Sequence, residues 1–169
     1  MVLILLLTSC LSTDFNNISL SKVSANDNPN SKPHTNNRVL APQFLPLTAE
    51  LCLGNSGPCI KLEVALGPNR QRVGLQKRPP LAPLRGMLFP QNPARAVKFW
   101  MHQTPAPLDM IFIHDQNVVA VIEHAPPCQR LPCPSYGPVR PVDAVLEIGA
   151  GQAAALGIQV GSPLKFRQL

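Results

Sequence analysis

The segment AVKFWMHQTPAPLDMIFIHD, residues 96–115, contains the clearest strand signals of the chain. It begins with an alternation that places Val97, Phe99 and Met101 on one side of an extended chain, which predicts a strand over 96–101. It ends with the apolar run LDMIFI (108–113). A second apolar run, VVAVIEH (118–124), follows after the turn-forming residues HDQN. Two such runs separated by a short polar turn predict a β-hairpin.

Strand patterns continue on both sides of this hairpin. IKLEVAL (60–66) alternates apolar and polar residues, AVLEI (144–148) is a short apolar run, and a last strand fits within 160–169. A short helix is expected from Gln152 to Leu156, closed by Gly157. The 20 prolines and the 14% of charged residues disfavour a helical bundle, because proline breaks helix interiors. We therefore expect one compact all-β domain over 46–169, a sandwich or a barrel.

Asp109 is the unusual residue of the opening stretch, since an ionised group in an apolar run costs free energy unless it is hydrogen-bonded. Its expected partners are close in sequence: the hydroxyl of Thr104, backbone N–H groups of the TPAP turn, or His102. One interpretation is a turn organiser. The other is a binding site for a small polar ligand or glycan at the rim of a pocket, formed by Trp100, His102, Thr104 and Asp109.

The same four residues leave an enzyme open as the alternative, because a His–Asp pair is a general-base arrangement. No serine or cysteine nucleophile is identifiable beside His102 and Asp109, so we assign no catalytic residue and expect no cofactor. Glu147 is a second carboxylate in an apolar strand, and a cross-strand arginine such as Arg140 is its expected partner. His114 and His124 lie at the ends of the hairpin without the spacing of a metal site, so no metal is expected.

The chain starts with MVLILLLTSC, an apolar run too short to span a bilayer, which takes about 20 apolar residues. It looks like the end of a secretory signal. The order Leu7-Thr8-Ser9-Cys10 resembles the bacterial lipobox, which implies a signal segment over 1–9 and a lipid on Cys10. Such a lipid would anchor the protein to a membrane of the cell envelope. The run lacks a basic start, so plain secretion and a chance apolar terminus remain as alternatives.

Residues 10–45 are expected to form a polar tether, because their Ser, Thr, Asn and Asp content is too high for a packed core. The cysteines support export. Besides Cys10 there are two close pairs, Cys52 with Cys59 and Cys128 with Cys133, which predict two small disulfide loops in an oxidising compartment. The alternative is a metal site made from the four sulfurs, although neither spacing is that of a zinc knuckle.

The positive charge is concentrated between residues 61 and 98, a segment with eight basic residues and a single acidic residue, Glu63; the net charge of the whole chain is +6. A solvated basic face explains this pattern, and attraction to an acidic envelope surface is the sharper interpretation. Nucleic acid is not expected as a partner, because no aromatic residues are interleaved with the basic ones as stacking platforms.

Five segments carry a resemblance to a known family, and they occur in this order: GLQKRPPL (74–81), GMLFP (86–90), FWMHQTPAPLDMIFI (99–113), APPCQRLPCPSYG (125–137) and VLEIGAGQAAALGIQVG (145–161). Together, over residues 60–169, they resemble the bacterial and archaeal domain-of-unknown-function family 192, also called uncharacterised protein family 0127. The central segment, with Trp100 to Asp109, is specific.

Three positions depart from the family pattern: Gln76 stands in place of a methionine, Gln103 in place of an asparagine, and Ser162 in place of an aspartate.

The resemblance implies a compact, mostly β fold and frequent export, but no reaction, since a fold alone supplies no function. The sequence therefore predicts an exported, lipid-anchored envelope protein with a non-catalytic binding or structural β domain. The alternative is an enzyme that acts on an envelope polymer or glycan through His102 and Asp109.

Overall fold

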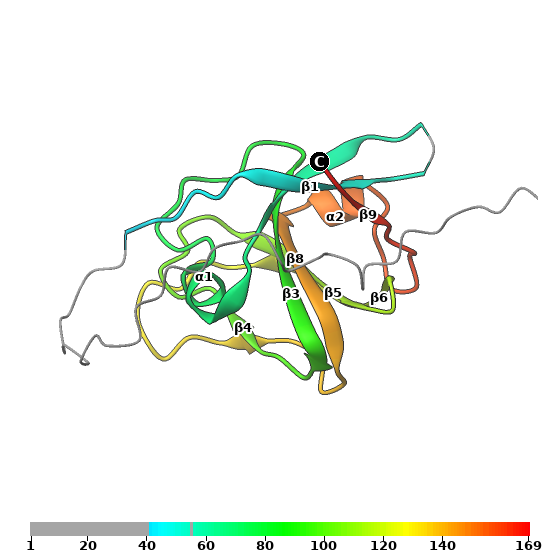
Figure 1. The fold of residues 1–169 in the computed structure, drawn as a ribbon. Helices are drawn as coiled ribbons and strands as arrows, with labels where there is room; N and C mark the ends of the chain where they lie inside the picture. Colours follow the sequence, from blue (N-terminus) through cyan, green and yellow to red (C-terminus); the bar gives the residue numbers. More distant parts are fainter. Residues whose placement is uncertain (1–40, 55) are drawn as a thin grey trace, which may run out of the picture. The chain divides into compact units, whose positions relative to one another are not determined.

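The computed structural model describes residues 41–54 and 56–169. The predicted signal segment, Cys10 and most of the predicted tether lie outside the described residues. The regular structure of the described part consists mostly of strands, with two short helices (Figure 1). The elements are β1 (Leu47–Cys52), β2 (Cys59–Val64), α1 (Gly67–Val73), β3 (Arg85–Arg95), β4 (Phe99–Trp100), β5 (Leu108–His114), β6 (Asn117–Ala125), β7 (Ser135–Tyr136), β8 (Val142–Gly149), α2 (Gln152–Ala155) and β9 (Phe166–Gln168).

Seven strands form one sheet in the order β6-β5-β8-β3-β2-β1-β9, and β4 pairs with β7 in a small second sheet. Neighbouring strands of the large sheet are antiparallel except β2 and β3, which are parallel. A parallel pair needs a crossover connection. Here α1 lies in that crossover, which places the helix over one face of the sheet.

The two edges of the large sheet are joined by backbone hydrogen bonds. Val118 N–H donates to the carbonyl of Ser162, Gly161 N–H to that of Val118, and Leu164 N–H to that of Gln116. These bonds connect the start of β6 to the segment that leads into β9, the opposite edge strand. The sheet is therefore bridged in the manner of a small barrel, and the predicted all-β fold is confirmed.

Buried apolar side chains lie on both faces of the large sheet. Phe89, Phe112 and Val145 belong to a cluster on one face, and Leu88, Ile111 and Leu146 point to the other face. Phe99 of β4 packs edge-to-face on Phe89, with ring centroids 5.0 Å apart. β5 is buried on both faces, because the cluster around Phe112 covers one face and α2 packs against the face that carries Asp109. This burial explains why its sequence is a continuous apolar run rather than an alternation.

The hairpin of β5 and β6 and the strands β2, β8 and β9 confirm the sequence patterns, as does the short helix α2, which ends at Ala155. The strand expected over 96–101 is shorter, with only Phe99 and Trp100 in β4. Sequence reasoning missed β1, β3, β7 and α1. Among the helices of the described residues, none has the length and apolar character needed to cross a membrane.

α1 and β3 were missed for different reasons. α1 buries no residue, so it has no apolar periodicity, and its signals are Pro68 near its start and Gly74 just after its end. β3 contains Pro90 and Pro93, which argue against a strand interior. The strand tolerates them because its pairing with β8 shifts register between Pro90 and Arg95.

Candidate functional site

Asp109 is completely buried, and both of its carboxylate oxygens accept hydrogen bonds from backbone N–H groups. Oδ1 accepts from His124 N–H at 2.9 Å, and Oδ2 accepts from Ala153 N–H at 2.9 Å. The expectation of local partners in the TPAP turn was wrong. The donors come instead from the end of β6 and from α2, so Asp109 ties three separate segments together.

The other three residues of the predicted rim site lie apart from Asp109. The Thr104 hydroxyl lies 3.5 Å from the His102 carbonyl, and the His102 ring contacts the Trp100 ring, with centroids 5.3 Å apart. The oxygens of Asp109 are both engaged elsewhere, so no His102–Asp109 pair forms. Trp100 remains 47% exposed, whereas Thr104 is buried.

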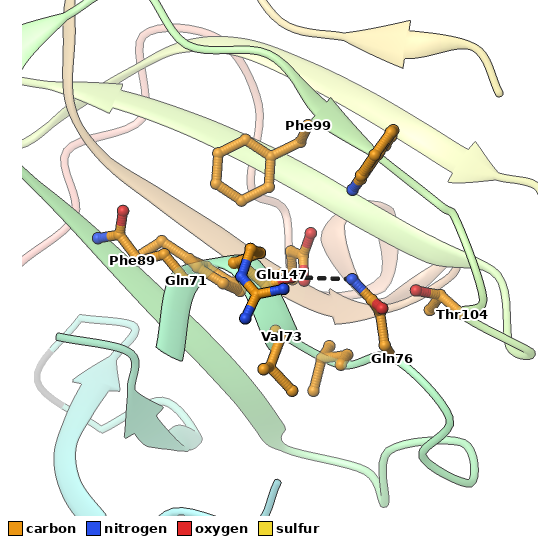
Figure 2. Close-up of a pocket in the computed structure, with 11 residues that line it drawn as sticks. Gln71, Val73, Gln76, Phe89, Phe99, Thr104 and Glu147 are labelled. Atoms are coloured by element: carbon orange, nitrogen blue, oxygen red, sulfur yellow. Dashed lines mark hydrogen bonds between the residues drawn. The ribbon is translucent and has the colours of Figure 1, made fainter. Parts of the chain in front are cut away.

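A small cavity lies beside Trp100 and Thr104, under α1 and the loop that follows it (Figure 2). Its volume of about 30 Å³ is room for the centres of two or three waters, since one water needs roughly 10–15 Å³ by this measure. His102 and Asp109 do not line it. The lining residues are Gln71, Arg72, Val73, Gly74, Leu75, Gln76, Phe89, Phe99, Trp100, Thr104 and Glu147.

Glu147 forms the inner wall of this cavity. It lies on β8, in register with Met87 of β3 and Met110 of β5, and on the same face of the sheet as Val145. Figure 2 shows its carboxyl group among the surrounding side chains, with Phe99 on one side and Val73 on the other. Sequence reasoning noted Glu147 but gave it no role in a site.

The Glu147 carboxyl group has no hydrogen bond or ion pair within the described residues, although the residue is only 5% exposed. The expected partner, Arg140, is exposed on the surface and makes no pair with it. Burial disfavours the charged form and raises the pKa of Glu147 from 4.5 to about 8. The group is therefore mostly protonated and uncharged at neutral pH.

The polar side chains around Glu147 are mostly occupied. Gln76 Nε2 donates to the Arg72 carbonyl at 2.8 Å, and Gln71 Nε2 donates to the Pro90 carbonyl at 2.7 Å. Arg72 is exposed and is the one cationic residue that lines the cavity. A buried carboxyl group with unused hydrogen-bonding capacity, set in a cavity, is a recognised mark of a functional site.

Parts of the basic segment 61–98 are neutralised by buried carboxylates. Arg78 Nη1 lies 2.7 Å from Glu63 Oε1, and both residues are buried. Lys61 Nζ lies 2.6 Å from Glu50 Oε2, and this hydrogen bond lowers the pKa of Glu50. The predicted basic face is thus less charged than its composition suggests.

His114 lies at the turn of the hairpin with two carboxylates. Its Nε2 is 3.6 Å from Asp115 Oδ2, and its Nδ1 is 3.7 Å from Asp143 Oδ2. The same Asp143 oxygen accepts a hydrogen bond from Asp115 N–H at 2.6 Å. Asp115 is largely exposed, whereas the Nδ1 atom of His114 is buried and has no hydrogen-bond partner within the described residues. His124, at the other end of the hairpin, is exposed.

The cysteines form the two local disulfides, Cys52–Cys59 and Cys128–Cys133. The local pairing predicted from their spacing is confirmed. The alternative metal site from four thiolates is excluded, because a sulfur in a disulfide is not available as a thiolate ligand.

Comparison with known proteins agrees with the resemblance found in the sequence. The model of domain-of-unknown-function family 192, described as "Uncharacterized ACR", matches residues 51–166. The chain belongs to this family. All of the residues that line the Glu147 cavity lie within the family 192 region.

Two crystal structures resemble the chain. A protein of unknown function from Novosphingobium aromaticivorans is 31% identical, with a TM-score of 0.63, and the match covers 80% of this chain and 99% of that one. A "putative transcription regulator" from Sinorhizobium meliloti is 32% identical, with a TM-score of 0.61, and the match covers 72% and 92%. No curated protein matches the chain.

Proposed function

We propose that this family 192 protein is an exported, lipid-anchored protein of the cell envelope whose β domain is a non-catalytic binding module for a small polar ligand. The observation that carries the binding role is the Glu147 carboxyl group, which is buried, lines a cavity and has no partner within the described residues. Its oxygens are not among the fully enclosed atoms that lack a partner, so they are reachable from the cavity, and a polar ligand there can hydrogen-bond to them.

Export is supported by the two disulfides, because such bonds persist in oxidising compartments and are rare in the cytosol. The anchor itself rests on the lipobox-like residues that end at Cys10. An enzyme using His102 and Asp109 has no comparable support. Asp109 is sealed from solvent and both of its oxygens accept backbone hydrogen bonds, which leaves it unable to act as an accessible base.

Localisation is tested with the signal peptidase inhibitor globomycin and with a Cys10→Ala variant. We expect both to leave a slower-migrating precursor and the wild type to be recovered with membranes. Cys52→Ser is the matched control, since it replaces a cysteine of the domain and breaks the Cys52–Cys59 disulfide without touching the anchor. Unchanged mobility in both cases would remove the lipid anchor from the proposal.

Binding is tested by thermal shift of the full-length protein against small amines, sugars, amino acids and carboxylic acids. A binding module gives at least one compound that raises the melting temperature of the wild type and not that of Glu147→Gln. A panel without any Glu147-dependent compound contradicts the binding role. Turnover of an envelope glycan that is lost in His102→Ala would instead establish the enzyme.

A further inference from the structure

The structure assigns a ligand class to the Glu147 cavity: we propose that it binds the ammonium head of a small, soluble primary amine. This inference rests on the proposed binding function and adds the chemistry of the ligand. Three features of the cavity carry it: an unpartnered carboxyl group at its inner wall, aromatic rings in its lining, and a volume that fits a slim ligand head.

The carboxyl group provides the charge. Glu147 is more than nine-tenths buried and neither donates to nor accepts from any described residue. A cation that enters the cavity would replace the proton of Glu147 and pair with the resulting carboxylate. Hydrogen bonds that involve charged groups are about twice as strong as neutral ones, so a primary ammonium, with three donors, is the cation that uses this acceptor best.

The aromatic rings provide a second contribution. Phe89, Phe99 and Trp100 all line the cavity, and Trp100 is half exposed at its outer side. Aromatic faces attract cations, by about 0.5–2 kcal/mol per contact, while they offer little to an anion. Val73 and Leu75 complete an apolar wall that suits the short alkyl chain behind an ammonium group.

The size of the cavity selects among cations. Room for two or three water centres accommodates an ammonium head with one or two carbon atoms. It excludes a quaternary ammonium, whose methyl groups surround the charge and also remove every N–H donor. A planar guanidinium is likewise broader than the compact head of a primary ammonium.

The charge of Arg72 allows an experiment to distinguish a cationic ligand from an anionic one. Among the lining residues, Arg72 and Glu147 are the only ones that carry or can acquire a charge, and the strand neighbours of Glu147, Met87 and Met110, are neutral. Arg72 repels a cationic ligand and would attract an anionic one. Removal of its charge therefore changes affinity in opposite directions for the two ligand classes.

The experiment uses the full-length protein and the fluorescence of Trp100, its only tryptophan. We expect methylammonium chloride to give a saturable change at pH 8, and tetramethylammonium chloride and sodium chloride at equal ionic strength to give none. Glu147→Gln should weaken methylammonium binding at least tenfold, because it removes the charge and keeps the shape. Arg72→Gln should strengthen binding two- to fivefold.

Proton release provides a second readout that does not depend on any variant. A group with a pKa of about 8 is mostly protonated at pH 7, so calorimetry in two buffers should detect release of close to one proton per bound methylammonium. Affinity should rise about tenfold from pH 6 to pH 7 and level off above pH 8.

Several outcomes overturn the proposal. Equal responses to methylammonium and tetramethylammonium would indicate an ionic-strength effect, and binding without proton release would show that methylammonium does not replace the proton of Glu147. Weaker methylammonium binding in Arg72→Gln would show that the charge of Arg72 does not oppose the ligand, which contradicts a cation held beside Glu147. If methylammonium fails while another compound of the thermal-shift panel binds in a Glu147-dependent manner, this inference fails and the binding function stands.

Discussion

Asp109 and Ala153 are 44 residues apart in sequence, and a hydrogen bond of 2.9 Å joins the Asp109 carboxylate to the Ala153 backbone N–H inside the protein. The second carboxylate oxygen accepts from His124 N–H, so one side chain holds the end of β6 and the start of α2 against β5. A buried N–H group that lost this acceptor would remain unsatisfied, since no water reaches the site.

Asp109→Asn should therefore lower the free energy of unfolding by about 2–4 kcal/mol. The amide keeps one acceptor oxygen but places an NH₂ group against one of the two backbone donors, and each buried unsatisfied group costs about 1–3 kcal/mol. Urea unfolding followed by Trp100 fluorescence measures the change. Thr104→Val is the matched control and should cost less than about 1 kcal/mol, because the Thr104 hydroxyl makes only a 3.5 Å contact with the His102 carbonyl. A larger cost for Thr104→Val than for Asp109→Asn would contradict the structure.

The pair of Glu63 and Arg78 should show strong coupling. Glu63 also accepts from Leu45 N–H at 2.7 Å, and the Arg78 guanidinium lies 4.5 Å from the centroid of the Phe44 ring. Arg78→Met leaves an uncompensated buried carboxylate, and removal of one partner of such a pair costs about 3–5 kcal/mol.

The test of this coupling is a double-mutant cycle by urea unfolding. Glu63→Gln with Arg78→Met should cost clearly less than the sum of the two single changes, because the double variant leaves no unpaired charge. Exact additivity would mean that the two charges do not interact in solution. Lys61→Met is a useful comparison, since Lys61 is partly exposed and its ion pair with Glu50 is worth less.

Much of the fold follows from local patterns in the sequence, whereas the candidate site does not. Period-two alternation predicted β2, because it reflects which face of a strand is buried, and two apolar runs around the HDQN turn predicted β5 and β6. The partners of Asp109 could not be found in this way, because they are brought to it by the pairing of β5 with β6 and by the packing of α2. The sequence predicts partners for Asp109 that lie nearby in the chain, whereas the actual donors are 15 and 44 residues away.

The cavity was missed for a related reason. Trp100 and Thr104 were singled out from the opening stretch, and both line the cavity, but its acidic group comes from β8 and its cover from α1. α1 has no buried residue and hence no periodic signal. The sequence signal for Glu147 is a carboxylate inside an apolar strand. The expected pairing with Arg140 on the surface gave no indication that Glu147 lines a cavity.

The disulfides make a prediction for peptide mapping. Trypsin cleaves after Arg130 and not between Arg140 and Pro141, so peptides 99–130 and 131–165 should appear joined through Cys128 and Cys133 without reductant. Peptide 39–61 carries both Cys52 and Cys59 and should be two hydrogen atoms lighter than after reduction. Thiol alkylation before denaturation is the control, and free thiols at Cys128 and Cys133 in protein taken directly from cells would place the domain in a reducing compartment.

The raised pKa of Glu147 predicts how stability depends on pH. In the unfolded chain the group ionises near 4.5, whereas in the folded protein it keeps its proton up to about pH 8. The folded state therefore binds more protons between these values, and stability falls as pH rises from 5 to 8, by at most about 1.4 kcal/mol per pH unit and about 4 kcal/mol in total. Glu147→Gln cannot ionise and should lose this slope, so its stability relative to the wild type should increase steadily from pH 5 to pH 8. Urea unfolding of both proteins at several pH values measures the difference, in which the contributions of all other titrating groups cancel. Asp143→Asn is the matched control, because it removes a carboxylate that is partly exposed. If the difference in stability between Glu147→Gln and the wild type is constant across this pH range, Glu147 is ionised in the folded protein and the prediction is wrong.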